Sequence, residues 1–98
     1  TDKIKNQVVI GQDNDLLSKG LVATKINWIS IPSLTRPKQV KAQIRNRHQA
    51  ADATIFPKKS GSVLVHFNNP QRAITPGQAV VFYQDDLVIG GGWIKKSL

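Results

Sequence analysis

The segment from residue 68 to residue 94 constrains the fold most, because it predicts antiparallel strands joined by short turns. Residues 75–77 are Thr-Pro-Gly, which favours a type II turn, since proline restricts φ and glycine accepts a positive φ. Two apolar runs, 78–84 and 87–89, are separated only by the aspartates at 85–86, a spacing typical of a tight hairpin. The segment therefore predicts a β-meander.

Three consecutive glycines at 90–92 precede Trp93 and Ile94, where a strand resumes. Glycine inside a strand suits a bulge, a sharp bend or a close approach of two backbones. A phosphate-binding loop is disfavoured, because the GxxxxGK[ST] and GxGxxG spacings are absent and a strand-like pair follows instead of a helix start. We interpret the glycines as structural.

The rest of the chain predicts further strands separated by turns. Extended segments are expected at residues 8–10, 21–28, 38–48, 52–57, 62–68 and 71–74. Residues 31–37 contain two prolines and predict a loop, while residues 58–61 close a hairpin. One short helical turn is expected near residues 13–19, capped at its start by Asp13 or Asn14 and stopped by Gly20.

The alternation in the first long strand predicts one face made of four residues: Val22, Thr24, Ile26 and Trp28. The chain has no Glu, few Leu and many Val, Ile and Thr, a composition that disfavours helices and favours strands. Many short strands with Pro and Gly turns indicate an all-β fold. We expect a small antiparallel β-barrel of about six or seven strands.

The length of 98 residues suits one domain with a single core. We expect a linker or frayed end at residues 1–6 and one domain at residues 7–98. The chain contains no Met, which indicates either processing of the initiator before Thr1 or excision from a longer protein, and the polar, strand-poor start favours excision. The absence of Cys excludes a disulfide, a thiolate metal site and a cysteine nucleophile within these residues. The longest apolar runs are too short for a membrane span or signal peptide, so we expect a cytoplasmic setting.

The chain is strongly basic, with 14 Lys and Arg against six acids and a net charge of +8, which attracts polyanions. In the strand at 38–48, Lys41, Arg45 and Arg47 alternate with apolar residues and project about 7 Å apart, close to the spacing of phosphates along a nucleic acid. Arg72 and the lysines at 58–59 extend this patch if the fold brings them near. The alternative is a solvated outer face of a barrel strand.

Other candidate sites have structural interpretations. Residues 13–15 lack the glycine and glutamate of a calcium loop and are interpreted as a helix cap, and residues 85–86 are interpreted as turn residues. His48 and His66 have no Cys or Glu to complete a metal site. Two tryptophans could stack on bases, but the core is the favoured location for both: Trp28 and Trp93.

Five stretches occur in the order seen in the tRNA-specific 2-thiouridylases: residues 11–13, 27–29, 44–47, 69–83 and 90–92. The long run NPQRAITPGQAVVFY at 69–83, followed by the triple glycine, is the most specific. The chain resembles the C-terminal β-barrel domain of these enzymes, a barrel similar to those of translation factors, and the resemblance covers nearly all of it.

This resemblance implies a three-part parent enzyme. Such enzymes use ATP, bound at an SGGxDS motif, to adenylate the wobble uridine of certain tRNAs at its C2 oxygen, and then displace AMP with sulfur carried as a cysteine persulfide. Neither SGGxDS nor Cys occurs here, so the resemblance implies that the fragment alone is not catalytic and binds no cofactor. The implied partners are the tRNA anticodon region and, for the parent, a sulfur-relay or cysteine desulfurase protein.

The resemblance also implies RNA contacts at Arg45, Asn46 and Gln78. Arg45 would pair with a phosphate and Gln78 would hydrogen-bond a ribose or base; relatives usually carry Tyr at position 46, so a stacking contact is absent here. Together with the basic patch, the candidate tRNA-binding set is Arg45, Asn46, Gln78, Arg47, Lys41 and Arg72. The competing hypothesis is a structural or protein-interaction barrel whose charge is only solubilising.

Overall fold

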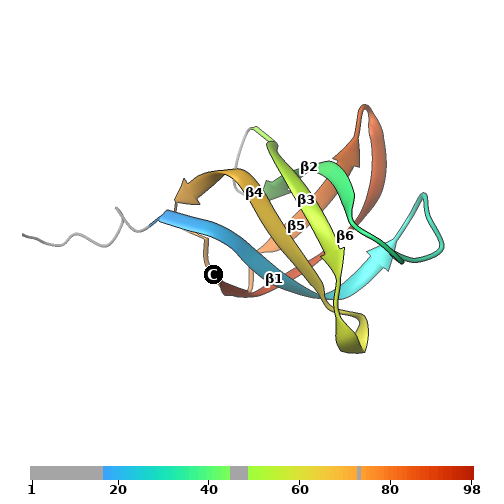
Figure 1. The fold of residues 1–98 in the computed structure, drawn as a ribbon, viewed down its shortest axis with the longest axis horizontal. Coiled ribbons are helices and arrows are strands. Elements are labelled where there is room, and N and C mark those ends of the chain that lie inside the picture. Colours follow the sequence, from blue (N-terminus) through green and yellow to red (C-terminus); the bar gives the residue numbers. More distant parts are fainter. Residues whose placement is uncertain (1–16, 45–48, 73) are drawn as a thin grey trace, which may run out of the picture.

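The computed structural model describes residues 17–44, 49–72 and 74–98. Six antiparallel strands close into a barrel with the neighbour order β1-β4-β3-β2-β5-β6 (Figure 1). Their bounds are β1 Leu17–Trp28, β2 Lys38–Ile44, β3 Ala51–Pro57, β4 Val63–Arg72, β5 Ala79–Gln84 and β6 Leu87–Ser97. The predicted all-β barrel is confirmed, and closure gives each of the six strands two neighbours.

The core lies inside the barrel and comes from alternate positions of each strand. In β2, Val40, Ala42 and Ile44 are buried while Lys41 points outward, as the alternation predicted. Phe82 of β5 is fully buried. Burying a side chain of this size contributes about 1.5–3 kcal/mol to stability, so the apolar interior is the main force that keeps the strands paired.

The inner face of β1 differs from the prediction. Leu21 and Ala23 lie in the core, whereas further along the strand Ile26 and Trp28 pack against it. The inward-facing positions change from odd-numbered to even-numbered residues at a β-bulge. There β1 has one residue more than the facing stretch of β6, and Lys25 has a φ of 53°. A bulge turns the following side chains to the opposite face. The prediction of a single uninterrupted face was therefore wrong.

The helical turn predicted near residues 13–19 is wrong for the part that the structure describes. Leu17 and Ser18 are strand residues of β1 and pair with Arg72 and Gln71 of β4, because ladder pairing overrides the local capping signal. Gly20 does not stop a helix; it lies in β1, where a Cβ atom would collide with the Val65 carbonyl. Residues 1–6, 8–10 and 13–16 lie outside the described residues.

The only helix in the described part of the chain is a 3₁₀ turn, η2 at Lys59–Gly61, between β3 and β4. This connection closes the predicted β3–β4 hairpin. The run predicted at 71–74 is not a separate strand, since Gln71 and Arg72 end β4. The type II turn is confirmed by the hydrogen bond from the Gln78 backbone N–H to the Thr75 carbonyl, 3.3 Å, and by a φ of 92° at Gly77.

The glycines at 90–92 have the predicted structural role. Strand β6 continues through them, with a register shift against β5 immediately before them, at Ile89. A Cβ atom on Gly91 would lie 2.7 Å from the Val80 carbonyl oxygen, and one on Gly92 would lie 2.6 Å from the Thr24 carbonyl oxygen. The absence of side chains lets β1, β5 and β6 approach closely, and the segment is not a phosphate loop.

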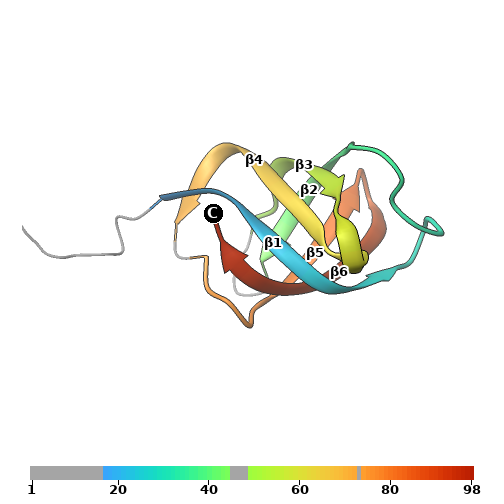
Figure 2. The same ribbon diagram turned by 60° about the horizontal axis from the view of Figure 1, so that its bottom comes forward.

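Antiparallel pairing gives the barrel two different ends (Figures 1 and 2). We call one the terminal end; there β1, β3 and β5 begin and β2, β4 and β6 finish. The other, the hairpin end, carries the loop 29–37 and the turns 58–62 and 85–86. The terminal end lies on the left in Figure 1.

Candidate nucleic-acid interface

Gln78 lies at the terminal end, directly after the type II turn and before β5. Its backbone carbonyl accepts a hydrogen bond of 2.8 Å from the Ile94 N–H. Its side-chain Oε1 accepts a long, weak bond of 3.4 Å from the Thr75 N–H. The oxygen of this half-buried side chain therefore supports the turn, and the carboxamide N–H groups are the donors with which it could bind a ribose or base.

Arg72 is exposed at the last position of β4, where it pairs with Leu17. It therefore shares the terminal end with Gln78. Strand β2 also finishes there, and Ile44, its last residue, pairs with Val80 two positions after Gln78. Three of the predicted contacts, Arg45, Asn46 and Arg47, follow Ile44 in sequence and lie outside the described residues.

Lys41 occupies a different part of the surface. It pairs with Tyr83, at the opposite end of β5 from Gln78. Its Nζ lies 3.1 Å from Oδ1 of Asp52, with the two side chains 56% and 63% exposed, and Asp85 lines the same hollow. An ion pair this exposed contributes only about 0–1 kcal/mol. Lys41 therefore faces outward as predicted, but among acids.

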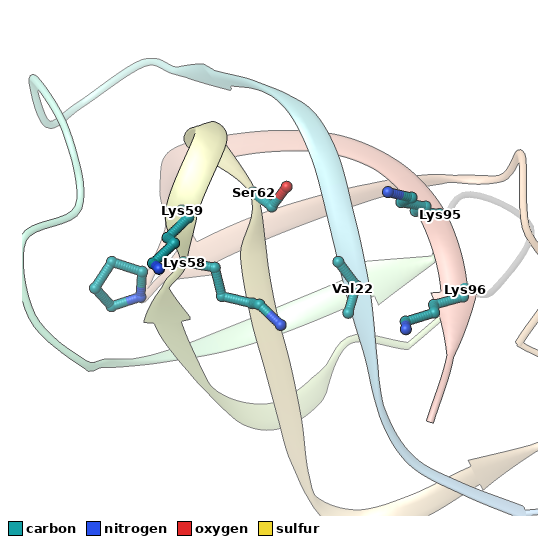
Figure 3. Close-up of a pocket in the computed structure, with 7 residues that line it drawn as sticks. Val22, Lys58, Lys59, Ser62, Lys95 and Lys96 are labelled. Atoms are coloured by element: carbon teal, nitrogen blue, oxygen red, sulfur yellow. The ribbon is translucent and has the colours of Figure 1, made fainter.

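The structure brings together four lysines that the sequence did not connect. Lys58 and Lys59 come from the β3–β4 connection, and Lys95 and Lys96 come from the end of β6. All four line one hollow, which we call the lysine groove, with Val22, Pro57 and Ser62 (Figure 3). The expected extension of the Lys41 patch by residues 58–59 does not occur, because these lysines gather over β1, which lies across the barrel from β2.

The two tryptophans differ. Trp28 packs against the core, with its ring centroid 6.2 Å from that of Phe82, as predicted. The core location predicted for Trp93 is wrong, since 46% of it is exposed and Ile94 takes the inward position. Trp93 borders a second, mostly apolar hollow that Ile29 and Val88 also line and whose floor includes the three glycines.

Neither a metal cluster nor a membrane helix is present in the part of the chain that the structure describes. No group of three or more His, Cys, Asp or Glu side chains is positioned to hold a metal ion there. None of its helices has the length and apolar character needed to cross a bilayer. His66 is an exposed residue of β4, and His48 lies outside the described residues.

Comparison with known proteins identifies the family. A family model described as the aminomethyltransferase beta-barrel domain matches residues 18–94. The tRNA-specific 2-thiouridylase MnmA of Symbiobacterium thermophilum is 48% identical over 97 residues, which cover 99% of this chain and 25% of that protein. The protein of the same name from Koribacter versatilis is 51% identical over 90 residues, 92% of this chain and 24% of its own length.

A third relative, tRNA-specific 2-thiouridylase MnmA of Acetivibrio thermocellus, is 51% identical over 94 residues, 96% of this chain and 26% of that protein. The chain thus spans about a quarter of the length of the curated relatives it matches. These matches confirm the resemblance noted from residues 69–83 and the triple glycine. The chain belongs to the aminomethyltransferase beta-barrel domain family, in the form carried by tRNA-specific 2-thiouridylases.

Proposed function

We propose that this chain is the C-terminal tRNA-contacting domain of an ATP-dependent tRNA 2-thiouridylase, which puts sulfur on C2 of the wobble uridine. The observation that carries the proposal is 48% identity along 97 residues to an enzyme named for that activity. In this proposal residues 7–98 form one domain after a linker at 1–6, and the parent acts in the cytoplasm. The other domains of the parent make up most of the parent's length.

The catalytic chemistry belongs to the parent. Adenylation turns the C2 oxygen into a leaving group, and a persulfide on a reactive cysteine supplies the sulfur nucleophile. This chain has no Cys, and its run of three glycines lies within strand β6, packed against the backbone of β1 and β5. ATP and the persulfide therefore bind elsewhere in the parent, which receives its sulfur from a sulfur-relay or cysteine desulfurase protein. The barrel binds and orients the tRNA.

The proposed contact surface is the terminal end of the barrel. Arg72 and Gln78 share this end, and β2 finishes beside Gln78, which supports a common surface with the residues that follow at 45–47. Arg45, Arg47 and Arg72 would bind phosphates of the anticodon region. Gln78 would hydrogen-bond a ribose or base, and Asn46 would add a polar contact without stacking. Lys41 is a peripheral phosphate contact.

Binding of an unmodified tRNA transcript at several salt concentrations tests this surface. We expect the affinity of the chain to fall as salt rises, because phosphate contacts release counterions. Arg45→Ala should weaken binding on the order of several-fold and lower the log–log salt slope by about 0.7–0.9. Arg36→Ala, which removes an exposed arginine from the loop at the hairpin end, is the matched control. Equal affinity at low and high salt would contradict the proposal.

The enzymatic part of the proposal has a separate test. The longer protein that carries this barrel should form 2-thiouridine at the wobble position when it is supplied with tRNA, ATP and a persulfide donor. Mass spectrometry of the digested tRNA measures the product. Absence of 2-thiouridine in the complete reaction would contradict the assignment.

A second candidate function is a structural or protein-interaction barrel, and one observation favours it. Trp93, Ile29 and Val88 are 46%, 61% and 36% exposed around the hollow with the glycine floor, and exposed apolar groups that gather together typically mark an interface. This function predicts no tRNA binding by the chain. It also predicts that parent activity survives loss of the basic residues and is abolished when core residues such as Val40 or Phe82 are disrupted.

A further inference from the structure

We propose that the lysine groove is a second phosphate-binding surface, which holds the backbone of the bound tRNA outside the terminal end. The identity of the polyanion rests on the proposed function. The groove itself rests on four lysines from two distant segments, Lys58-Lys59 and Lys95-Lys96, which line one hollow.

The β3–β4 connection holds the first lysine pair in a defined position. The Lys58 N–H donates to the Ser62 carbonyl at 3.0 Å, and the Ser62 N–H donates to the Lys59 carbonyl at 3.3 Å. Ser60 and Gly61 both have positive φ, 64° and 76°, which closes the turn tightly. Both lysines therefore start from an ordered backbone at the rim of the hollow.

A β-bulge in β6 places the second pair. Val22 pairs with Lys96 and Ala23 pairs with Ile94, so Lys95 is an extra residue between two paired positions. Consecutive strand residues normally point to opposite faces, but a bulge breaks this alternation. Both lysines are exposed while Ile94 stays in the core. Figure 3 shows Lys58 and Lys96 extending toward Val22 from opposite sides.

The charges in the groove are unbalanced. No acid from the described residues lines the hollow, and its floor includes Val22, an apolar residue that is only 5% exposed. A concave surface lined by charges of one sign over apolar walls concentrates counterions. The mutual repulsion of the ammonium groups is relieved when an anion binds between them. The groove is therefore built to attract negative charge.

The lining indicates a phosphate backbone as the ligand. The hollow measures about 680 Å³, within the usual range for small-molecule sites, but such sites are mostly apolar with a few polar groups. Lysine is a point charge without the planar fork of arginine, so it binds phosphate without reading a base. Each strand of the closed barrel already has two neighbours, which disfavours the addition of an acidic peptide as a further strand.

The groove also borders the proposed terminal-end surface. Lys96 is the penultimate residue of β6, which finishes at the terminal end, whereas Lys58 lies in the turn at the hairpin end. Val22 pairs with Lys96, and its neighbour Ala23 pairs with Val63, which follows the turn that carries Lys58 and Lys59, so the two lysine pairs face each other across β1. A tRNA bound at the terminal end can continue its backbone into this groove.

The test compares tRNA binding by the chain and by two double variants with equal charge change. Lys58→Gln/Lys96→Gln should raise the dissociation constant on the order of tenfold and lower the log–log salt slope by about 1.4–1.8, for two lost phosphate contacts. Lys25→Gln/Lys38→Gln, which alters lysines outside the groove, should leave the slope nearly unchanged. Circular dichroism checks that each variant keeps the fold.

A charge-preserving variant separates electrostatics from packing. Lys58→Arg/Lys96→Arg should bind tRNA as the wild type does, because the phosphate contacts persist; loss of binding here would overturn the groove proposal. Equal slopes for Lys58→Gln/Lys96→Gln and its control would also overturn it, leave the proposed function standing and point to an acidic protein face. Failure of the wild-type chain to bind tRNA would instead overturn the proposed tRNA contact, and the groove assignment with it.

Discussion

Two lysine-bearing surfaces lie on the outside of this barrel and differ in their neighbours. Lys41 is the first residue of the basic stripe predicted from the sequence, yet its ammonium group pairs with Asp52 and it shares its hollow with Asp85. The lysine groove collects four lysines from the β3–β4 turn and the end of β6, with no acid from the described residues among its lining. The charge around a lysine thus depends on the residues of the neighbouring strands, and a regular pattern of basic residues along one strand does not predict it.

The difference has a consequence for binding. A phosphate that approaches Lys41 must compete with a carboxylate 3.1 Å away, and the exposed ion pair is weak enough to exchange. A phosphate that enters the lysine groove displaces no carboxylate of the described residues and relieves repulsion among four cations. We therefore expect the groove to contribute more to tRNA affinity than Lys41 does.

Both lysine-bearing surfaces depend on the folded barrel, so a substitution that destabilises the core should weaken both. Phe82→Ala deletes a fully buried aromatic ring and should lower the free energy of unfolding by about 3–5 kcal/mol. Chemical denaturation followed by circular dichroism measures this. Leu87→Ala is the control, because Leu87 is 54% exposed and should change stability by less than about 0.5 kcal/mol. Similar losses for both variants would contradict the assigned core.

Charge reversal should separate the two surfaces. Lys58→Glu/Lys96→Glu places two carboxylates in the lysine groove and should weaken tRNA binding on the order of 100-fold at low salt, since it adds repulsion to the lost contacts. Lys41→Glu should weaken binding only several-fold. Fluorescence anisotropy with labelled tRNA measures both affinities. A larger loss of tRNA affinity for Lys41→Glu than for Lys58→Glu/Lys96→Glu would contradict the greater contribution of the lysine groove.

Removal of an acid should make the Lys41 surface behave more like the groove. Asp52→Asn deletes the ion-pair partner of Lys41 and should cost less than about 1 kcal/mol of stability. It should strengthen tRNA binding by about two- to threefold at low salt, because Lys41 then meets a phosphate without competition. The matched control is Asp86→Asn, which removes an equal charge at the hairpin tip. An equal gain in tRNA affinity for Asp86→Asn would mean that the change in net charge, and not the loss of the Lys41 ion pair, causes the effect.

Local signals predicted much of the fold. The alternation through Val40, Ala42 and Ile44, the Thr-Pro-Gly turn before Gln78 and the two-aspartate hairpin depend on neighbours in sequence, and each occurs in the structure. The helical turn failed at residues 17–19, because Leu17 and Ser18 gain ladder pairing with β4 that no local propensity reveals. The barrel was thus predictable from local pattern, whereas the start of its first strand and the bulge within that strand were not.

The candidate surfaces depend on register between distant segments, and this limited their prediction. The bulge at Lys25 exchanged the faces of β1, and the bulge at Lys95 kept two consecutive lysines outside. Neither bulge carries a glycine or proline signal in the sequence. The dipeptides Lys58-Lys59 and Lys95-Lys96 were visible from the start, but only the pairing of β1 with β4 and β6 brings them together.

Lysine footprinting with and without tRNA tests the comparison most directly. Acetylation of exposed lysines followed by mass spectrometry reports each side chain of the wild-type chain in one experiment. We predict that bound tRNA protects Lys58, Lys59, Lys95 and Lys96 strongly, Lys41 weakly and Lys25 hardly at all. Protection of Lys41 with full acetylation of the four groove lysines would contradict the account.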